Sequence, residues 1–371
     1  MHGYPWGGSE ELWSLAALRL KAAGHFVAAT TEDVPPVPQK LRDLVEKGIP
    51  VRVRKAPPGA LGRALWSRLT GHTARDPHKE WVVRQRPDLV VISQGGNTDG
   101  WHWMKFCREQ ALPFMAVSHC NTETAWPADR DVDEIAAAYR AARVVACVSR
   151  HNLRLLEWQL GGKLPNARVI WNPNLAAALE LLPWPAESEK TRLACVGRLD
   201  PVAKGQDVLL QALALPQWRA RPVELNLYGT GPAEKTLRAM ARRLSLDNVN
   251  FCGYASVAEI WRDNHLLAMP SRQEGLPLTL VEAMSCGRPA VVTDVGGNAE
   301  MCVEGEMGFI ASAAAVTPMA EALERAWTRR ADWPQMGRAG RQRIMELVPR
   351  DPVGDFCEIL TSMGSREAQA H

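Results

Sequence analysis

Short runs of β-branched and apolar residues alternate with helical patterns along almost the whole chain. The expected strands are residues 26–30, 49–53, 89–93, 114–118, 144–148 and 169–171 in the first half, and 192–196, 224–228, 249–252, 266–269, 290–293 and 308–310 in the second. Strands separated by helices favour parallel βαβ units. At 371 residues the chain is long enough for two such α/β domains, which predicts a cleft between them.

A Pro-rich stretch divides the chain near residue 180 and is typical of a hinge. We therefore expect one α/β domain over residues 1–178, a second over 179–348, and a helix and tail over 349–371 that pack back on the first domain. The first domain opens with a Gly-rich loop and a helix over residues 10–23 instead of a buried strand. Its first strand is thus expected to be missing: either the domain is built differently, or the natural protein begins upstream of Met1.

The composition excludes several classes of protein. Hydrophobic residues make up 46% and charged residues 23%, which is typical of a globular chain. A net charge of +3 without a long Lys/Arg block disfavours a nucleic-acid partner. The eight cysteines are scattered, so neither a zinc site nor a disulfide framework is expected. Without a signal peptide or an apolar run long enough to span a bilayer, we expect a cytoplasmic protein, and the basic stretches 52–55 and 238–243 leave peripheral contact with the inner face of the membrane open.

Two glutamates eight positions apart lie in the densest motif, residues 270–289. Glu274 follows an expected strand, and Pro277 is expected to open the next helix, where a missing N–H has no cost. Open α/β sheets bind ligands at the carboxyl ends of their strands, and a helix N-terminus offers amides to phosphate. Glu282 lies on that helix, where a carboxylate can accept both hydroxyls of a ribose. Two solvated helix residues are the alternative, but Gly275 allows a close backbone approach and favours a site.

A cationic loop follows the first strand of the second half. Gly197 permits a tight exit from the strand, Arg198 offers a planar fork for phosphate oxygens, and Lys204 offers a point charge. Gly-rich turns recur at later strand ends, in residues 228–232 and 295–300. Each of these loops is unremarkable alone. Together, four loops at strand ends are expected to converge on one ligand that carries a diphosphate.

In this second half the sequence resembles the nucleotide-sugar-binding domain of the retaining family 4 glycosyltransferases, also called glycosyl transferases group 1. The matching motifs occur in order between residues 193 and 311: Gly-Arg-x5-Lys-Gly, Tyr-Gly-x-Gly-Pro, Phe-x-Gly-Tyr, Pro-Ser-x2-Glu-Gly-x6-Glu-Ala-Met-x2-Gly-x-Pro and Gly-Gly-x2-Glu. The resemblance implies an α/β fold of the GT-B type, in which two Rossmann-like, doubly wound parallel-sheet domains face each other across a cleft.

The resemblance also implies roles for single residues. Arg198 and Lys204 would bind the donor diphosphate, Glu274 the hydroxyls of the transferred sugar, and Glu282 the ribose. Pro277 stands where many relatives have Gly, which leaves the identity of the sugar open. The further donor-binding positions that it implies are Gly197, Gly229, Gly231, Gly253, Tyr254, Ser271, Gly275, Leu276 and Leu278, with Gly253 and its neighbours lining the base.

The first half resembles the acceptor-side domain of the same family more loosely. Gly7 and Gly8, before a helix, resemble the donor-binding loop that meets the phosphate and the acceptor. His119, at the end of an expected strand, resembles the histidine that reaches into the cleft near the transferred sugar. A lone histidine at a strand end is more often structural, and only the family match favours the catalytic role. The implied catalytic residues are therefore Glu274, Arg198, Lys204 and His119.

The sequence thus predicts a retaining glycosyltransferase that uses a UDP- or GDP-sugar as co-substrate. The acceptor would be a hydroxyl of a glycan, of a lipid-linked sugar or of a small molecule, and the oligomeric state is open. No metal and no cofactor are expected, because the Asp-x-Asp triplet at 131–133 reads as a helix cap outside the donor half. The alternatives are a sugar-nucleotide epimerase or phosphorylase of the same fold, and a non-catalytic nucleotide-sugar-binding protein. A dehydrogenase is disfavoured because no Gly-x-Gly-x2-Gly follows a strand.

Overall fold

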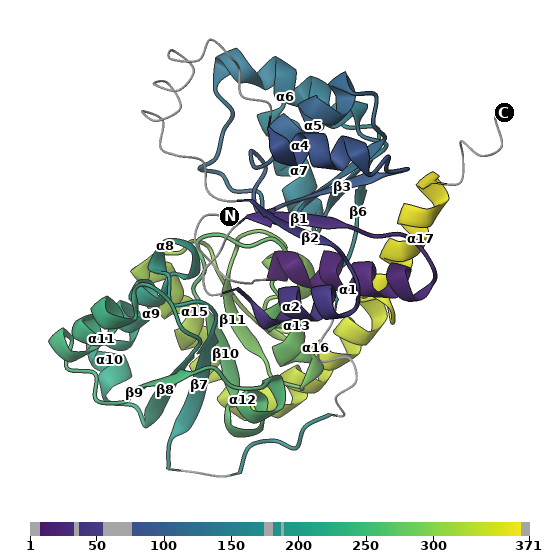
Figure 1. The fold of residues 1–371 in the computed structure, drawn as a ribbon. Coiled ribbons are helices and arrows are strands. Elements are labelled where there is room, and N and C mark those ends of the chain that lie inside the picture. The colour runs from purple at the N-terminus through teal and green to yellow at the C-terminus, as the bar shows by residue number, and fades with distance from the viewer. Residues whose placement is uncertain (1–7, 33–36, 55–75, 174–180, 187–188, 365–371) are drawn as a thin grey trace.

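The structure is a computed structural model, and it describes residues 8–32, 37–54, 76–173, 181–186 and 189–364. Figure 1 shows two α/β halves, the first above the second. The predicted boundary at 178/179 lies among residues 174–180, outside the described part of the chain. Within the described ranges, no helix combines the length and apolarity needed to cross a bilayer.

The second half is built on a six-stranded parallel sheet. Its strands are β7 (Thr191–Val196), β8 (Val223–Tyr228), β9 (Val249–Gly253), β10 (Leu266–Met269), β11 (Ala290–Thr293) and β12 (Gly308–Ala311). Their order in the sheet is β12-β11-β10-β7-β8-β9. The chain therefore winds outward from β7 in one direction and, after crossing over, from β10 in the other. The two adjacent central strands form a topological switch point, where doubly wound sheets bind ligands.

Helices connect these strands and cover the sheet. They are α8 (Pro201–Lys204), α9 (Gln206–Leu213), α10 (Pro216–Arg219), α11 (Glu234–Arg243), α12 (Val257–Asp263), α13 (Leu278–Ser285), α14 (Asn298–Met301), α15 (Val316–Thr328), a short 3-10 helix (Arg330–Asp332) and α16 (Trp333–Leu347). Local signals start several of them. Asp200 caps α8 before Pro201, and Ser256 forms a capping box with Glu259 at the start of α12.

In the first half, two separate parallel sheets are present among the described residues. One pairs β1 (Ala29–Glu32) with β2 (Val51–Arg54), and the other has the order β3-β4-β5-β6. The strands of the second sheet are β3 (Val90–Gln94), β4 (Phe114–Ser118), β5 (Val144–Cys147) and β6 (Ala167–Val169). Strand β1 begins later than the sequence predicted, because it pairs with β2 from Ala29 opposite Val51.

The helices of the first half are α1 (Gly8–Ala22), α2 (Gln39–Glu46), α4 (Pro77–Arg84), α5 (Trp101–Glu109), α6 (Asp129–Ala141) and α7 (Arg150–Gln159). The last helix of the chain, α17 (Pro352–Gly364), lies beside α1 (Figure 1). Arg19 of α1 forms an ion pair with Asp351, 2.6 Å away, just before α17. The end of the chain therefore packs on its beginning.

One apolar cluster joins the two halves. It contains Leu12 of α1 and Met115 of β4 from the first half together with Leu280 and Met284 of α13 from the second, all at most 1% exposed. Burial of such side chains stabilises by about 1.5–3 kcal/mol each. The halves thus share a core at α13, the helix that follows the Glu274 loop.

Candidate functional site

The loops that follow β7 and β10 meet at the switch point. A Cβ built on Gly205 would lie 2.0 Å from the carbonyl oxygen of Pro270, and Gly205 has φ +64°. Only glycine combines this backbone conformation with so close an approach. The loop that carries Lys204 is therefore pressed against the loop that carries Glu274.

Lys204 and Glu274 form the centre of the candidate site. The Nζ atom of Lys204 donates to Oε1 of Glu274 at 2.7 Å, and Oγ of Ser271 donates to the same oxygen at 2.7 Å. The Glu274 side chain is only 7% exposed, whereas that of Lys204 is 27% exposed. The sequence predicted these three residues as separate contacts to a donor, and the structure brings them into one hydrogen-bonded group.

A second ion pair connects the Glu274 loop to α9. Arg272 donates to both carboxylate oxygens of Asp207 in α9, at 2.6 and 2.9 Å, and to the carbonyl of Pro201 at 2.6 Å. Bidentate pairs of this kind constrain geometry as well as adding energy. Sequence reasoning missed this pair, because 65 residues separate its members and Arg272 occupies an unspecified position of the 270–289 motif.

Arg198 is turned toward its own loop. Its guanidinium donates to Oδ2 of Asp200 at 2.8 Å, while Oδ1 of Asp200 accepts from the amide of Val202 at the start of α8. The Arg198 side chain is 34% exposed. The structure thus places Arg198 on the loop that contains Lys204, in contact with a capping carboxylate.

The Gly-rich turn after β8 packs against the Arg198 loop. A Cβ on Gly229 would lie 2.2 Å from the carbonyl oxygen of Gly197, and one on Gly231 would lie 2.5 Å from that of Leu199. Gly229 also donates to the carbonyl of Gly253 at the end of β9, at 2.6 Å. These glycines are required by backbone packing between strand ends, which brings three of the predicted donor loops together.

Tyr254 extends into solvent beyond this cluster, with 91% of its surface exposed. It directly follows Gly253, whose φ is +67°. The predicted base-lining segment is therefore an open edge of the site, at the last strand of the sheet on this side.

The two halves touch at the Glu274 loop. A Cβ on Gly275 would lie 1.7 Å from the carbonyl oxygen of His119, which follows β4 in the first half. Leu276 is 5% exposed, and a Cβ on Gly8 would lie 3.3 Å from Cδ1 of Leu278. Several residues predicted from the two halves thus come together here. Gly7 lies outside the described residues.

The ring of His119 is buried in the first half. Its Nε2 lies 3.2 Å from Oγ of Ser93. Burial lowers the pKa of His119 to about 4, and the nearby side chain of Asn172 opposes the shift. The imidazole is therefore neutral at physiological pH, where it can accept or donate one hydrogen bond without carrying charge.

Helix α13 does not begin at Pro277 as predicted. It begins at Leu278, and Pro277 is the residue that precedes it with φ −72° and ψ 119°. The extended ψ of Pro277 places it just outside the helix. Glu282, predicted to bind the ribose, lies on this helix.

Glu282 has an unusual ionisation. Burial and, to a lesser extent, the negative charge of Glu11 in α1 together raise its pKa to about 7. Glu11 is itself paired with Lys40. The Glu282 carboxyl of the second half thus faces the Glu11 carboxylate of the first half. The charge of Glu282 is therefore sensitive to both pH and the approach of α1.

This shift predicts a pH dependence. Unfolding returns the pKa of Glu282 from about 7 to its ordinary 4.5, so the folded state is progressively disfavoured as pH rises from 4.5 to 7. Replacing Glu282 by Gln removes the penalty, so the variant should exceed the wild type in stability by about 1–3 kcal/mol at pH 8 and by little at pH 4.5. Chemical denaturation of both proteins at the two pH values measures this. A stability difference that is the same at both would contradict the assigned environment of Glu282.

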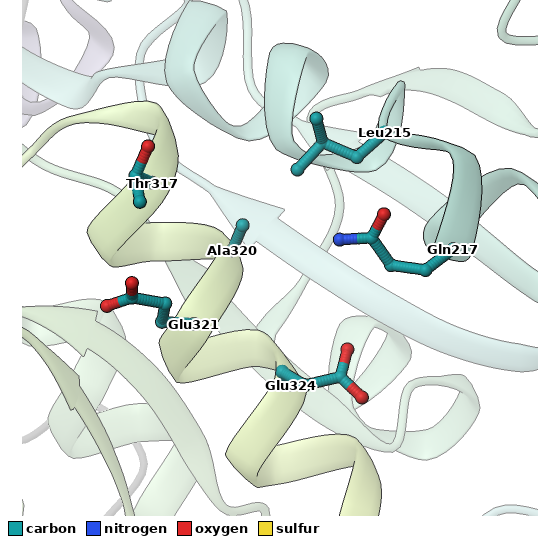
Figure 2. A pocket seen from close by; sticks show the side chains of 6 residues that line it. All are labelled: Leu215, Gln217, Thr317, Ala320, Glu321 and Glu324. Carbon is teal, nitrogen blue, oxygen red and sulfur yellow. The ribbon is translucent and has the colours of Figure 1, made fainter.

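A pocket of about 340 Å³ lies elsewhere, between α15 and α10 with the residue before it (Figure 2). Leu215, Gln217, Thr317, Ala320, Glu321 and Glu324 line it. None of these residues was predicted to bind the donor. Glu324 is instead engaged by Arg221 in a bidentate ion pair, at 2.7 and 2.8 Å.

Comparison with known proteins finds a family match in the second half. The family described as glycosyl transferases group 1 matches residues 190–329, the region that carries the β7, β8 and β10 loops. The chain is 31% identical over 185 residues to a GDP-mannose-dependent alpha-(1-6)-phosphatidylinositol monomannoside mannosyltransferase of Mycobacterium tuberculosis, which covers 47% of this chain and 48% of the relative. It is 31% identical over 182 residues to a D-inositol 3-phosphate glycosyltransferase of Gordonia bronchialis, which covers 43% of this chain and 39% of the relative. These matches span about half the length of the relatives, or less.

A solved structure covers the whole fold. The Anabaena protein Alr3699/HepE, crystallised with UDP, superposes with a TM-score of 0.72 over 98% of both chains at 19% identity. Such identity shows the arrangement of elements alone. It confirms the predicted fold class, two α/β domains of the GT-B type. Residues 190–329 of this chain therefore match the glycosyl transferases group 1 family, and the whole chain has the two-domain GT-B fold.

Proposed function

We propose that the chain transfers a sugar from a nucleotide-diphosphate sugar to an acceptor hydroxyl. The observation that carries this proposal is the Lys204–Glu274 ion pair, held by Ser271 at the switch point of the second sheet. Its cation can receive the diphosphate, and its carboxylate can receive sugar hydroxyls. The family match over these loops and the named activities of the two curated relatives support the same reading.

The geometry favours an orienting role for Glu274 over a role as base. Both of its described hydrogen bonds engage Oε1, and hydroxyls of the sugar can donate to Oε2. In the proposed step, the C1–O bond to the diphosphate breaks and a bond forms between C1 and the acceptor oxygen. The acceptor proton passes to a phosphate oxygen of the leaving group. The acceptor attacks on the face from which the diphosphate departs, so the anomeric configuration is retained.

The proposed catalytic contribution is electrostatic. Negative charge develops on the diphosphate as the bond breaks, and Lys204 and Arg198 stand on the loop that would receive it. Preorganised charges of this kind contribute more than any other single effect in many enzymes. No metal is needed in this scheme, and treatment with a chelator is expected to leave the rate unchanged.

The proposed donor is a UDP- or GDP-sugar. One curated relative is named for GDP-mannose, and Alr3699/HepE was solved with UDP-glucose. The proposed acceptor is a hydroxyl of a glycan, of a lipid-linked sugar or of a small molecule.

The test is a product analysis. The protein is incubated with each nucleotide sugar and a mixture of hydroxyl acceptors, with and without chelator, and products are followed by mass spectrometry and proton NMR. Release of the nucleoside diphosphate with a new glycoside of unchanged anomeric configuration is expected. An isomerised nucleotide sugar would identify an epimerase, a sugar phosphate would identify a phosphorylase, and bound but unchanged donor would identify a binding protein.

A further inference from the structure

Glu300 joins the two halves through the start of α7. It lies in α14 of the second half, and each of its carboxylate oxygens accepts a backbone hydrogen bond from the first half. Oε1 accepts from the amide of His151 at 2.8 Å, and Oε2 accepts from the amide of Arg150 at 3.2 Å. These bonds connect residues 150 and 149 positions apart in the sequence.

The start of α7 needs such a partner. The first amides of a helix have no acceptor within the helix, and the helix dipole concentrates positive charge there. The side chain of Ser149 satisfies only the amide of Asn152, at 3.1 Å. The amides of Arg150 and His151 are left for another acceptor, and a carboxylate with two oxygens matches two adjacent N–H groups.

The turn before Glu300 lies against the candidate site. The amide of Gly297 donates to the carbonyl of Gly275 at 2.7 Å, and a Cβ on Gly296 would lie 2.2 Å from the carbonyl oxygen of Glu274. On its other side, a Cβ on Gly297 would lie 3.0 Å from Cβ of Ser149. One turn thus separates the sugar-binding loop from the cap of α7.

Glu300 is in turn held in place. Arg343 of α16 donates to the carbonyls of Glu300 and Met301, at 3.0 and 3.1 Å. The carboxylate therefore has little freedom to follow α7 if the halves move apart. Separation of the halves would break both bonds and expose the α7 amides to water.

We propose that Glu300 is a positioning residue for transfer, which caps α7 across the cleft and holds His119 and its strand against the Glu274 loop. The proposal rests on the transferase function proposed above. Glu300 acts through the approach of the two halves, not by touching the donor. Glu300 therefore sets the fraction of molecules in which the two halves are joined with the acceptor side aligned. That fraction determines kcat and how well water is excluded from the site.

The test compares Glu300→Ala and Glu300→Gln with the control Glu306→Gln. Glu306 is an exposed glutamate of the same half whose side chain makes no hydrogen bond among the described residues. Loss of a carboxylate at a helix start shifts the balance between the joined and separated halves by about 5- to 30-fold. In Glu300→Ala, kcat should fall by about this factor, KM for the donor should change less than about twofold, and donor hydrolysis should rise relative to transfer. Glu300→Gln keeps one oxygen acceptor, so its kcat should lie between those of the wild type and Glu300→Ala.

Small-angle scattering with UDP, with GDP and without nucleotide gives an independent readout. Glu300→Ala should have a larger radius of gyration than the wild type and the control, with an unchanged circular dichroism spectrum. Equal scattering and equal kcat in Glu300→Ala and the wild type would overturn the proposal. If Glu300→Ala fails to fold, an unchanged kcat and radius in Glu300→Gln overturns it. If the wild type transfers no sugar, the proposed function fails, and scattering alone still decides whether Glu300 joins the halves.

Discussion

Lys204→Met is expected to lower the rate of sugar transfer by about 10²–10³, the loss typical of removing one preorganised charge from a transition state. Lys204 donates to Glu274 at 2.7 Å, so the substitution removes the charge proposed to meet the diphosphate and also releases the carboxylate proposed to bind the sugar. Because Glu274 is 7% exposed, its charge is left poorly solvated, which should also destabilise the fold by about 1–3 kcal/mol.

The two effects can be separated. The double variant Lys204→Met/Glu274→Gln no longer carries the unpaired buried charge of Glu274. Its melting temperature should therefore recover, while sugar transfer stays lost. Lys235→Met is the matched control, since Lys235 is exposed in α11 of the same half and has no partner among the described residues. Steady-state rates and thermal melts of the four proteins measure both. Retention of the wild-type rate in Lys204→Met would show that the site has been placed wrongly.

Gly275→Ala is expected to abolish most transfer, by about 10²-fold or more, while the second half still folds. The added methyl would lie 1.7 Å from the carbonyl oxygen of His119, well inside any real contact distance. Either the two halves separate or the Glu274 loop moves, and a displacement of about 1 Å at a reacting centre can cost about 10²-fold in rate.

A comparison of nucleotide binding with transfer rate distinguishes Gly275→Ala from a variant that is only less stable. Nucleotide binding should weaken less than transfer, because the clash is with the first half and the Lys204 loop is untouched. Gly364→Ala serves as control, since a Cβ there meets nothing within 4 Å. Calorimetric titration with UDP and GDP, together with transfer rates, gives both quantities. An active Gly275→Ala would mean that the observed approach of the halves is not the one in which the reaction occurs.

The strands and the donor-side loops could be predicted from sequence because their signals are local. Apolar runs such as Leu266–Met269 are buried on both sides, and the glycines of the second half mark turns that the backbone needs. Lys204 and Glu274 were predicted from their places at strand ends, which the order of the parallel sheet brings together. The roles assigned to Lys204, Glu274, Arg198, Glu282 and His119 remain predictions.

The contacts between distant segments could not be predicted, because no local pattern records them. Glu300 was found in a Gly-rich motif, but its carboxylate accepts from two backbone amides at the start of α7, which no local pattern indicates. Arg288, within the 270–289 motif, is 1% exposed and donates to the carbonyls of Trp261 and Pro183. Burial lowers the pKa of Arg288 to about 10. The charge repulsion between Glu11 and Glu282 likewise exists only when α1 lies against α13 in the folded protein.

The central claim is that the loops after β7 and β10 hold a nucleotide sugar. The most direct measurement is a thermal-shift panel of UDP-, GDP-, ADP- and dTDP-sugars with the wild type and Lys204→Met. A ligand at about 100 times its Kd stabilises a protein by about 2.7 kcal/mol, so at least one donor should raise the wild-type melting temperature by about 3 °C or more and the variant's by much less. A panel in which no nucleotide sugar shifts the wild type, or in which the variant shifts equally, would contradict the claim.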